Sequence, residues 1–323
     1  MPVKMCLSRL PLRCLKLSFG HITIIGRTGS GKTNTVKVIL EEIVKRKAGN
    51  ILVLDWAGEY KGLKEYKPGI NFKINIAGEP ATYDPDYAYF LADVFSSVLN
   101  LSDPQAYLLY KTLKKLRPPF RLAEIVSAVE NAEVRSYKDL DVKAALLRRL
   151  EPLNDGILGK ALNGSQDPYA IFKEKAIVKL NTIPSLRGRT LLALIILRNL
   201  YDYMYSNEKS DEIHHFTVLE EAWNIVPYRR REEPPSIGER LFLEIRKYGE
   251  CLIAISQSLG DISERIIRNS SLILLHSSLP GETRYLGLMG IEGDLLPKRV
   301  GEALAITSDG KVGKIKIRKA SRM

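Results

Sequence analysis

Eight consecutive residues near the start of the chain have the types and spacing of a phosphate-binding loop. They fit the pattern G-x-x-x-x-G-K-[ST] and are Gly26, Arg27, Thr28, Gly29, Ser30, Gly31, Lys32 and Thr33. In such a loop, backbone N–H groups and a helix N-terminus converge on phosphate oxygens, and glycine keeps the approach clear. We expect Lys32 to reach the β- and γ-phosphates and the Thr33 hydroxyl to bind Mg²⁺. The run predicts binding of a nucleoside triphosphate; the alternative is a glycine-rich surface turn.

Two adjacent carboxylates follow the apolar run 216–219. Neighbouring positions on a strand point to opposite faces, so Glu220 and Glu221 can have different tasks. We expect Glu220 to hold Mg²⁺ through water and Glu221 to polarise the water that attacks the γ-phosphate. The alternative is a pair of solvated acids at a strand end.

Gln257 and Arg246 lie at the two ends of a further apolar run, 252–256. The Gln257 amide can hydrogen-bond both the attacking water and a phosphate oxygen, and so sense the γ-phosphate. Arg246 is expected at the end of a helix over 237–247. A guanidinium there suits insertion into a neighbouring subunit's site, where it offsets transition-state charge; an ordinary surface arginine is the alternative.

Asp55 ends the apolar run 51–54 and is followed by Gly58, Glu59 and Tyr60. A parallel strand delivers an acidic residue to the carboxyl edge of a sheet in this way. We expect Asp55 to face the nucleotide or a neighbouring subunit; a turn aspartate is the alternative.

The elements around these residues alternate between strands and helices. The run 21–25 predicts a strand that leads into the glycine loop, and the apolar spacing over 36–44 predicts the helix behind it. Asp309 and Gly310 mark a hairpin between 303–306 and 312–317. The pattern predicts an α/β fold of the P-loop NTPase type (RecA-like/ASCE), with a mainly parallel sheet, a helical insertion and a C-terminal β-hairpin. Further strands are expected at 176–180, 216–219, 252–256 and 271–275, with a helix at 188–205.

Residues 84–164 have helical rather than strand-like periodicity. We therefore expect residues 1–83 to be the first part of the ATPase core, 84–164 a helical insertion, and 165–323 the remainder of the core. Asp103 and Pro104 have the pattern of an N-cap followed by proline. The insertion's basic residues can touch DNA, although a solvated helix face is the favoured interpretation. These residues are Lys111, Lys114, Lys115, Arg148 and Arg149.

Composition limits the class of protein and its partners. The chain has 323 residues and a formal net charge of +12, which makes a polyanion such as nucleic acid or membrane phospholipid a plausible partner. Its apolar runs are too short to cross a bilayer, so we expect a cytoplasmic protein, attached to the inner face of the membrane only through partners. Cys6, Cys14 and Cys251 lack metal-ligand spacing and are expected to be small core or surface residues.

Six motifs, in this order, resemble the HerA/FtsK branch of P-loop ATPases, which includes conjugation ATPases of type IV secretion and archaeal DNA-transfer ATPases. The glycine loop alone indicates only nucleotide binding, whereas the later motifs are more specific. The motifs are GRTGSGKT at 26–33, LDWAGEY at 54–60, LEEAW at 219–223, IRKYG at 245–249, ISQS at 255–258 and GEAL at 301–304.

The resemblance implies a Mg²⁺-dependent ATPase that forms a hexameric ring and threads duplex DNA. It also implies that an arginine from the next subunit, matching Arg246, completes each site. Two features depart from the family pattern. Glu220 stands where aspartate is commoner. With only about twenty residues ahead of the glycine loop, we also expect the small β-barrel that precedes the ATPase core in HerA to be missing.

We therefore expect an ATP-driven DNA translocase that acts in DNA transfer or DNA processing. Its expected partners are further copies of the chain, DNA (duplex or single-stranded), and a membrane DNA-transfer complex or a nuclease. The alternative is an ATPase subunit that powers a secretion or pilus-type assembly without gripping DNA. A small-molecule kinase is disfavoured by the placement of Arg246 and Gln257.

Overall fold

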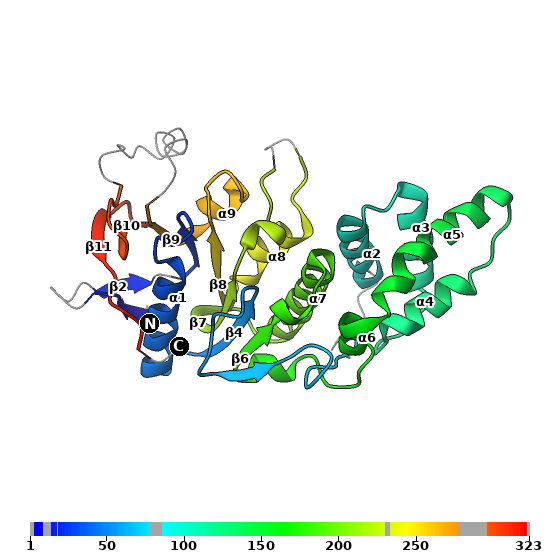
Figure 1. Ribbon diagram of the computed structural model, residues 1–323, viewed down its shortest axis with the longest axis horizontal. Helices are drawn as coiled ribbons and strands as arrows, with labels where there is room; N and C mark the ends of the chain where they lie inside the picture. The colour runs from blue at the N-terminus through cyan, green and yellow to red at the C-terminus, as the bar shows by residue number, and fades with distance from the viewer. Residues whose placement is uncertain are drawn as a thin grey trace. The chain divides into compact units, whose positions relative to one another are not determined.

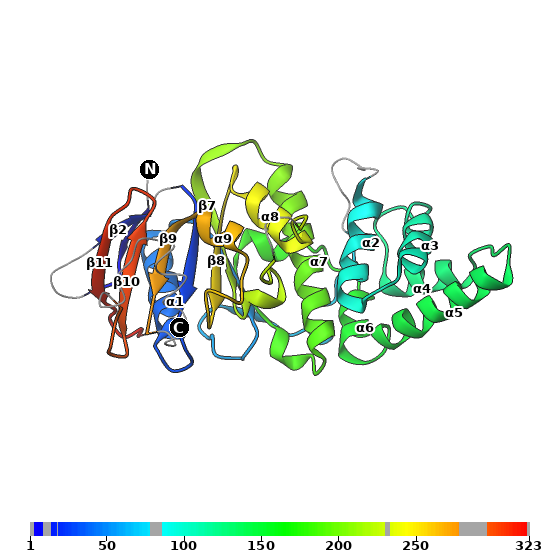
Figure 2. The same cartoon turned by 90° about the horizontal axis from the view of Figure 1, so that it is seen from above.

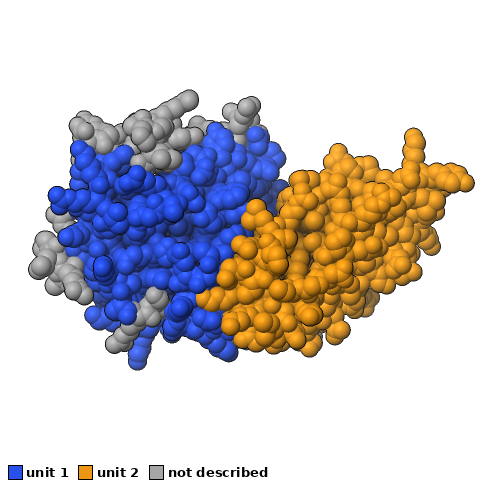
Figure 3. All heavy atoms as spheres, in the orientation of Figure 1, with its two compact units in different colours: residues 1–65, 172–177, 207–323 blue, residues 66–171, 178–206 orange. Residues whose placement is uncertain are grey.

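The computed structural model describes residues 3–8, 14–17, 19–77, 86–229, 233–277 and 296–321 (Figure 1). The chain divides into two compact units, coloured separately in Figure 3. Unit 1 comprises residues 1–65, 172–177 and 207–323, and unit 2 comprises 66–171 and 178–206. The helical segment expected at 84–164 falls within unit 2, which begins earlier in the chain and also takes in 178–206.

Among the described residues, nine strands form one sheet in the order β11-β10-β9-β3-β8-β7-β4-β6-β5. In its centre β3 pairs with β8 and β9, and β7 pairs with β8 and β4, all in parallel. Strand β10 pairs antiparallel with β9 and β11. The strands are β3 (His21–Ile25), β4 (Asn50–Asp55), β5 (Lys64–Tyr66), β6 (Lys175–Lys179), β7 (Ser210–Leu219), β8 (Tyr248–Ser256), β9 (Ser270–Leu275), β10 (Glu302–Thr307) and β11 (Val312–Lys316).

This topology confirms the predicted α/β fold, with its mainly parallel sheet and antiparallel C-terminal hairpin. The strands expected at 21–25, 51–54 and 252–256 all form. Strand β7 is longer than the apolar run 216–219 indicated, because it continues through the polar residues from Ser210. Polar residues at the solvent end of a strand carry no apolar signal, which explains the shorter prediction.

Helix α1 (Lys32–Arg46) follows the glycine loop and covers one face of the sheet (Figure 1). Most of its apolar residues, among them Val36, Ile39 and Ile43, are fully buried. They pack with alternate residues of the strands, such as Ile22 and Ile24 of β3, in one continuous core. Helices α8 (Ile237–Ile245) and α9 (Glu264–Arg268) contact β8 and β9. The parallel strands are thus buried on both faces, as their unbroken apolar runs predict.

A two-stranded ribbon, β1 (Val3–Cys6) and β2 (Cys14–Leu17), lies beside α1 (Figure 2). No local pattern predicted this ribbon. Cys6 pairs with Cys14 in the register and is disulfide-bonded, so the expectation of a small core or surface residue was wrong for Cys6. Cys251 has a free thiol and is buried, as expected.

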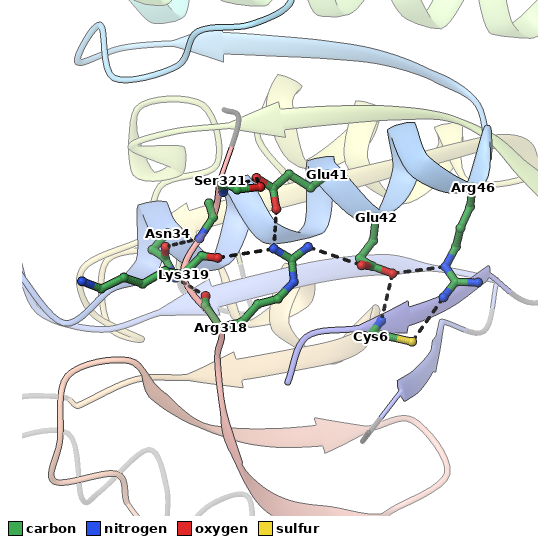
Figure 4. Close-up of polar contacts among 9 residues, drawn as sticks. Cys6, Asn34, Glu41, Glu42, Arg46, Arg318, Lys319 and Ser321 are labelled. Atoms are coloured by element: carbon green, nitrogen blue, oxygen red, sulfur yellow. Dashed lines mark hydrogen bonds and ion pairs between the residues drawn. The ribbon is translucent and has the colours of Figure 1, made fainter. Parts of the chain in front are cut away.

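The segment 317–321 runs along α1 and is tied to it by polar contacts (Figure 4). Arg318 forms ion pairs with Glu41 and, at 3.3 Å, with Glu42, two carboxylates that are nearly buried on the helix. Asn34 donates to the backbone carbonyl of Arg318 at 2.8 Å and accepts from the N–H of Ala320 at 2.9 Å. Helix α1, which follows the glycine loop, is therefore linked to the last described residues of the chain.

Unit 2 is helical. The N-cap of helix α3 is Ser102, whereas the sequence predicted Asp103. Gln105 accepts a hydrogen bond from the Ser102 N–H at 3.0 Å, as in a capping box. Arg198 of α7 lies over the rings of Tyr87 and Phe90. The helices are α2 (Asp86–Leu99), α3 (Asp103–Leu113), α4 (Leu122–Glu130), α5 (Tyr137–Leu150), α6 (Gly156–Leu162) and α7 (Leu186–Tyr205). In the described ranges, no helix combines the length and apolar character that crossing a membrane requires.

Candidate nucleotide-binding site

Four neighbouring strands end at the same edge of the sheet, and each ends at, or leads directly into, a residue that the sequence predicts to be functional. The parallel register aligns Ile25 of β3 with Ser256 of β8, and Leu54 of β4 with Leu219 of β7. The glycine loop, Gln257, Glu220 and Asp55 come directly after these positions. The sheet order β3-β8-β7-β4 therefore brings together segments that are up to about 230 residues apart.

The glycine loop presents backbone donors in the arrangement that binds anions. Gly29 and Gly31 have φ values of +78° and +104°, in the left-handed region that glycine adopts without strain. The backbone N–H groups of Gly29, Gly31, Lys32 and Thr33 find no acceptor among the residues that the structure describes. Unpaired N–H groups at a helix N-terminus are a binding site for phosphate oxygens.

His276 packs against the glycine loop at Gly26. A Cβ atom at Gly26 would lie 2.6 Å from the Cβ atom of His276, so only glycine fits there. The Nε2 atom of His276 is 2.9 Å from the Thr35 hydroxyl on α1, and burial lowers the pKa of His276 to about 4. His276 is thus a neutral side chain that connects the end of β9 to α1.

Lys32 lies inside the loop and donates to the backbone carbonyls of Gly26 and, at 3.1 Å, of Arg27. Burial is the main reason why the pKa of Lys32 is lowered, and it is opposed by the charges of Glu221, Glu220 and Glu59. A half-buried ammonium beside anionic groups suits the phosphate-binding role expected from the sequence.

Glu221 is connected to the glycine loop through Gln257. The Thr28 hydroxyl donates to Oε1 of Gln257 at 3.2 Å, and Nε2 of Gln257 donates to Oε1 of Glu221 at 3.3 Å. The second carboxylate oxygen of Glu221 accepts from the indole N–H of Trp223 at 2.7 Å. The structure thus places the expected base and the expected γ-phosphate sensor in direct contact.

The backbone of Glu221 has a left-handed conformation, with φ +45°. A non-glycine residue in this region costs about 1–3 kcal/mol and persists only where its surroundings enforce it. Here the N–H and side-chain amide of Asn224 both donate to the carbonyl of Glu221, at 2.9 and 3.1 Å. The turn fixes the direction in which the Glu221 side chain leaves the strand end.

Glu220 points to the other side, toward the loop after β4. Its Oε2 atom accepts from the N–H groups of Trp56 and Ala57, at 3.0 and 3.2 Å. Burial, with the charge of Asp55 second, raises the pKa of Glu220 to about 7, although the two backbone donors act in the opposite direction. The adjacent acids thus have separate environments, as expected for a strand end.

Asp55 is fully buried and shapes its own loop. Its Oδ1 atom accepts from the N–H groups of Gly58 and Glu59, at 2.7 and 3.1 Å, and Oδ2 accepts from Tyr60 N–H at 3.3 Å. These contacts correspond to the turn aspartate that the sequence left as the alternative to a nucleotide-facing carboxylate.

Arg246 is not brought to the glycine loop of its own chain. It follows α8, just before β8, whereas Gln257 follows the other end of that strand. Strand β8 itself is about 26 Å long at the usual rise per residue. Arg246 is exposed, and its guanidinium carbon lies 5.5 Å from the Phe19 ring centroid. Action on a neighbouring subunit's site stays a prediction.

The oxygen ligands near the loop fit Mg²⁺. Mg²⁺ binds few protein side chains and keeps several waters and phosphate oxygens as ligands. The Thr33 hydroxyl at the start of α1 and the buried carboxylate of Glu220 are hard oxygen ligands of this kind. In the described part of the chain, no group of three or more His, Cys, Asp or Glu side chains is placed so as to hold a metal ion by itself.

Two residues of the site were not identified as functional from the sequence. Trp223 belongs to the LEEAW motif, but an indole two residues after a carboxylate gives no chemical signal until the turn folds. His276 is far from the other motifs in the sequence and approaches Gly26 only because β9 pairs with β3.

Comparison with known proteins identifies the family of the chain. Residues 4–200 match the family described as "Helicase HerA, central domain". The chain is 24% identical over 300 residues to the DNA double-strand break repair helicase HerA of Sulfurisphaera tokodaii, and 23% over 333 residues to that of Saccharolobus solfataricus. These alignments cover 82% and 91% of the chain, but only 57% and 62% of the two HerA proteins.

Solved structures share the fold. VirB4 of Thermoanaerobacter pseudethanolicus matches with a TM-score of 0.74 at 18% identity, over 99% of this chain and 97% of that one. The bacterial conjugative coupling protein TrwB matches with a TM-score of 0.66 at 9% identity, over 99% and 90% of the two chains. The family model covers more than half of the sequence, and the chain therefore belongs to the HerA helicase central-domain family.

Proposed function

We propose that the chain is an ATP-hydrolysing motor that moves DNA. The observation that carries the proposal is the contact of Glu221 with Gln257, which in turn is bonded to Thr28 of the glycine loop. This chain of bonds joins a carboxylate base to the loop that would hold the phosphates. The two HerA relatives, named as DNA double-strand break repair helicases, support the choice of DNA.

In the proposed reaction, the loop N–H groups and Lys32 bind the β- and γ-phosphates. Glu221 accepts a proton from water while the water oxygen bonds to the γ-phosphorus, and the bond from that phosphorus to the bridging oxygen breaks. ADP and inorganic phosphate are the products. Gln257, within reach of both Glu221 and the loop, orients the water and responds to the γ-phosphate.

Thr33 and Glu220 would hold Mg²⁺ beside the phosphates. The ion would neutralise part of the phosphate charge in the transition state. A nearby cation also favours the ionised form of Glu220, whose pKa is otherwise raised to about 7.

In the proposed motor, each active site lies between two subunits. Arg246 is exposed at the edge of the sheet opposite the glycine loop, so it cannot contact phosphates bound to the loop of its own chain. We propose that Arg246 completes the site of the next copy in a homo-hexameric ring. The net charge of +12 supports a polyanionic substrate whose backbone is gripped without regard to sequence.

The test is the rate of ATP hydrolysis with and without duplex DNA, measured beside the solution mass with ATP. We expect DNA to stimulate hydrolysis by an ATP-dependent hexamer. Turnover that is indifferent to DNA, together with binding to a membrane complex, would favour the second candidate, an ATPase that powers a secretion or pilus-type assembly without gripping DNA. The match to VirB4 shows the fold alone and does not decide between the two.

A further inference from the structure

Tyrosines and lysines that are exposed or half-buried gather on one side of helix α3 in unit 2. Tyr107, Tyr110, Lys111 and Lys114 are spaced at i, i+3, i+4 and i+7, which places them on the same side of the helix. Together with Tyr89 of the adjacent helix α2 we call them the α3 face. The buried residues of α3 lie on its other side and are Gln105, Leu109, Thr112 and Leu113.

Two of the three aromatic rings of the α3 face are open to solvent, and the third, Tyr110, is half-buried. Tyr107 is 61% exposed and Tyr89 is 55% exposed. The rings of Tyr89 and Tyr110 meet edge to face with centroids 6.0 Å apart, and the Lys111 ammonium lies 5.5 Å from the centroid of the Tyr107 ring. These contacts hold the rings in place and leave accessible aromatic surface next to a positive charge.

The lysines belong to a segment that is strongly basic. Residues 111–121 contain five basic side chains and no acidic one, and all five are exposed. Carboxylates of the described residues form no ion pair with any of them. The five are Lys111, Lys114, Lys115, Arg117 and Arg121.

Neither helix stability nor packing accounts for the whole set. Lysines in a last helical turn interact favourably with the helix dipole, but this does not explain exposed tyrosines on the same side. Arg149, by contrast, has a structural role, since its guanidinium donates to the carbonyls of Leu99 and Asn100 at the end of α2. Among the described residues, the lysines of the α3 face form no comparable hydrogen bonds to backbone carbonyls.

Two acidic residues lie near the α3 face. Asp103 begins α3, and Asp93 lies four residues after Tyr89 in α2, on the same side of that helix. Asp103 is eight residues from Lys111, about 12 Å along the helix. Tyr107 lies one turn after Asp103, so the positive charge of the α3 face is concentrated beyond it, at Lys111 and Lys114.

We propose that the α3 face binds single-stranded DNA, an inference that rests on the proposed function and adds a surface to it. Unpaired bases stack on the tyrosine rings while Lys111 and Lys114 contact phosphates. In a duplex the bases stack on one another, so the rings find no free base face. The α3 face is therefore expected to bind single-stranded DNA more tightly than duplex DNA.

The test is fluorescence anisotropy with the full chain and a labelled oligothymidine of about 20 nucleotides, longer than the ~4–16 nucleotides that a single binding fold covers. Tyr107→Ala is expected to weaken binding about tenfold, and Tyr107→Phe to bind like the wild type, because stacking needs only the ring. The double variant Lys111→Ala/Lys114→Ala is expected to reduce the slope of log affinity against log salt by about 1.4. Lys160→Ala, an exposed lysine on α6, is the matched control and should leave the slope unchanged.

The proposal is overturned if Tyr107→Ala and the double lysine variant bind like the wild type, or if a duplex binds more tightly than the single strand. ATP hydrolysis without DNA separates this result from failure of the proposed function, since Tyr107→Ala should retain the wild-type basal rate. A chain that hydrolyses no ATP but loses single-strand binding in these variants would refute the motor and support the surface.

Discussion

The indole N–H of Trp223 donates to the carboxylate of Glu221 at 2.7 Å, on the oxygen that Gln257 does not contact. Each carboxylate oxygen thus has its own donor. With the left-handed backbone at Glu221, this fixes the group that we expect to activate water. Trp223 acts through Glu221 and is a positioning residue.

Trp223→Phe should lower kcat about tenfold with little change in KM, because a hydrogen bond to a charged group contributes about 1.5–3 kcal/mol and phosphate binding is untouched. Trp223→His, which retains an N–H donor, is expected to recover part of the loss. Steady-state kinetics measure both. Equal kcat in wild type and Trp223→Phe would show that the indole does not position the base.

The stability of the protein should depend on pH through Glu220. The pKa of this carboxyl is raised from 4.5 to about 7, so the folded state binds more protons than the unfolded state between these pH values. The free energy of unfolding therefore falls as pH rises through this window, by up to about 3 kcal/mol, and is constant above it.

Urea denaturation at pH 5 and pH 8, without nucleotide, measures this dependence. Glu220→Gln cannot ionise and should lose most of the difference between the two pH values. The same pH dependence in both proteins would assign the effect to another group.

Arg318→Ala should destabilise the fold by about 3–5 kcal/mol, because it leaves the carboxylates of Glu41 and Glu42 buried beside each other without this cation. Lys319→Ala removes a neighbouring exposed cation and is expected to change stability by less than about 0.5 kcal/mol. Urea midpoints of the two variants make the comparison. Similar midpoints would mean that the contacts in Figure 4 contribute little.

Arg246→Ala should abolish hydrolysis even in assembled rings, since an arginine acting in trans contributes about 10³–10⁵ in kcat. Mixing it with Glu221→Gln should restore activity, because some interfaces then combine an intact Glu221 with an intact Arg246 from the next copy. Lys247→Ala, the adjacent exposed cation, is the control. Absence of restored activity in mixed rings would argue against an arginine supplied by the neighbour.

The fold was predictable because its central strands are apolar and short, and the loop and helix that follow β3 have strong local signals. The positions of Glu220, Glu221 and Gln257 at one sheet edge followed from the rule that parallel strands end together. The β1–β2 ribbon was missed because four-residue strands carry too little periodicity. The contacts of Arg318, Trp223 and His276 depend on tertiary pairing between distant segments, which no local pattern encodes.

The measurement that most directly tests the central claim is ATP turnover by Glu221→Gln, with ATP binding measured on the same preparation. The account predicts that this variant binds ATP as the wild type does and loses nearly all hydrolysis, whereas Lys32→Ala binds ATP weakly. Near-normal turnover in Glu221→Gln would contradict the assignment of the base and of the site built around it.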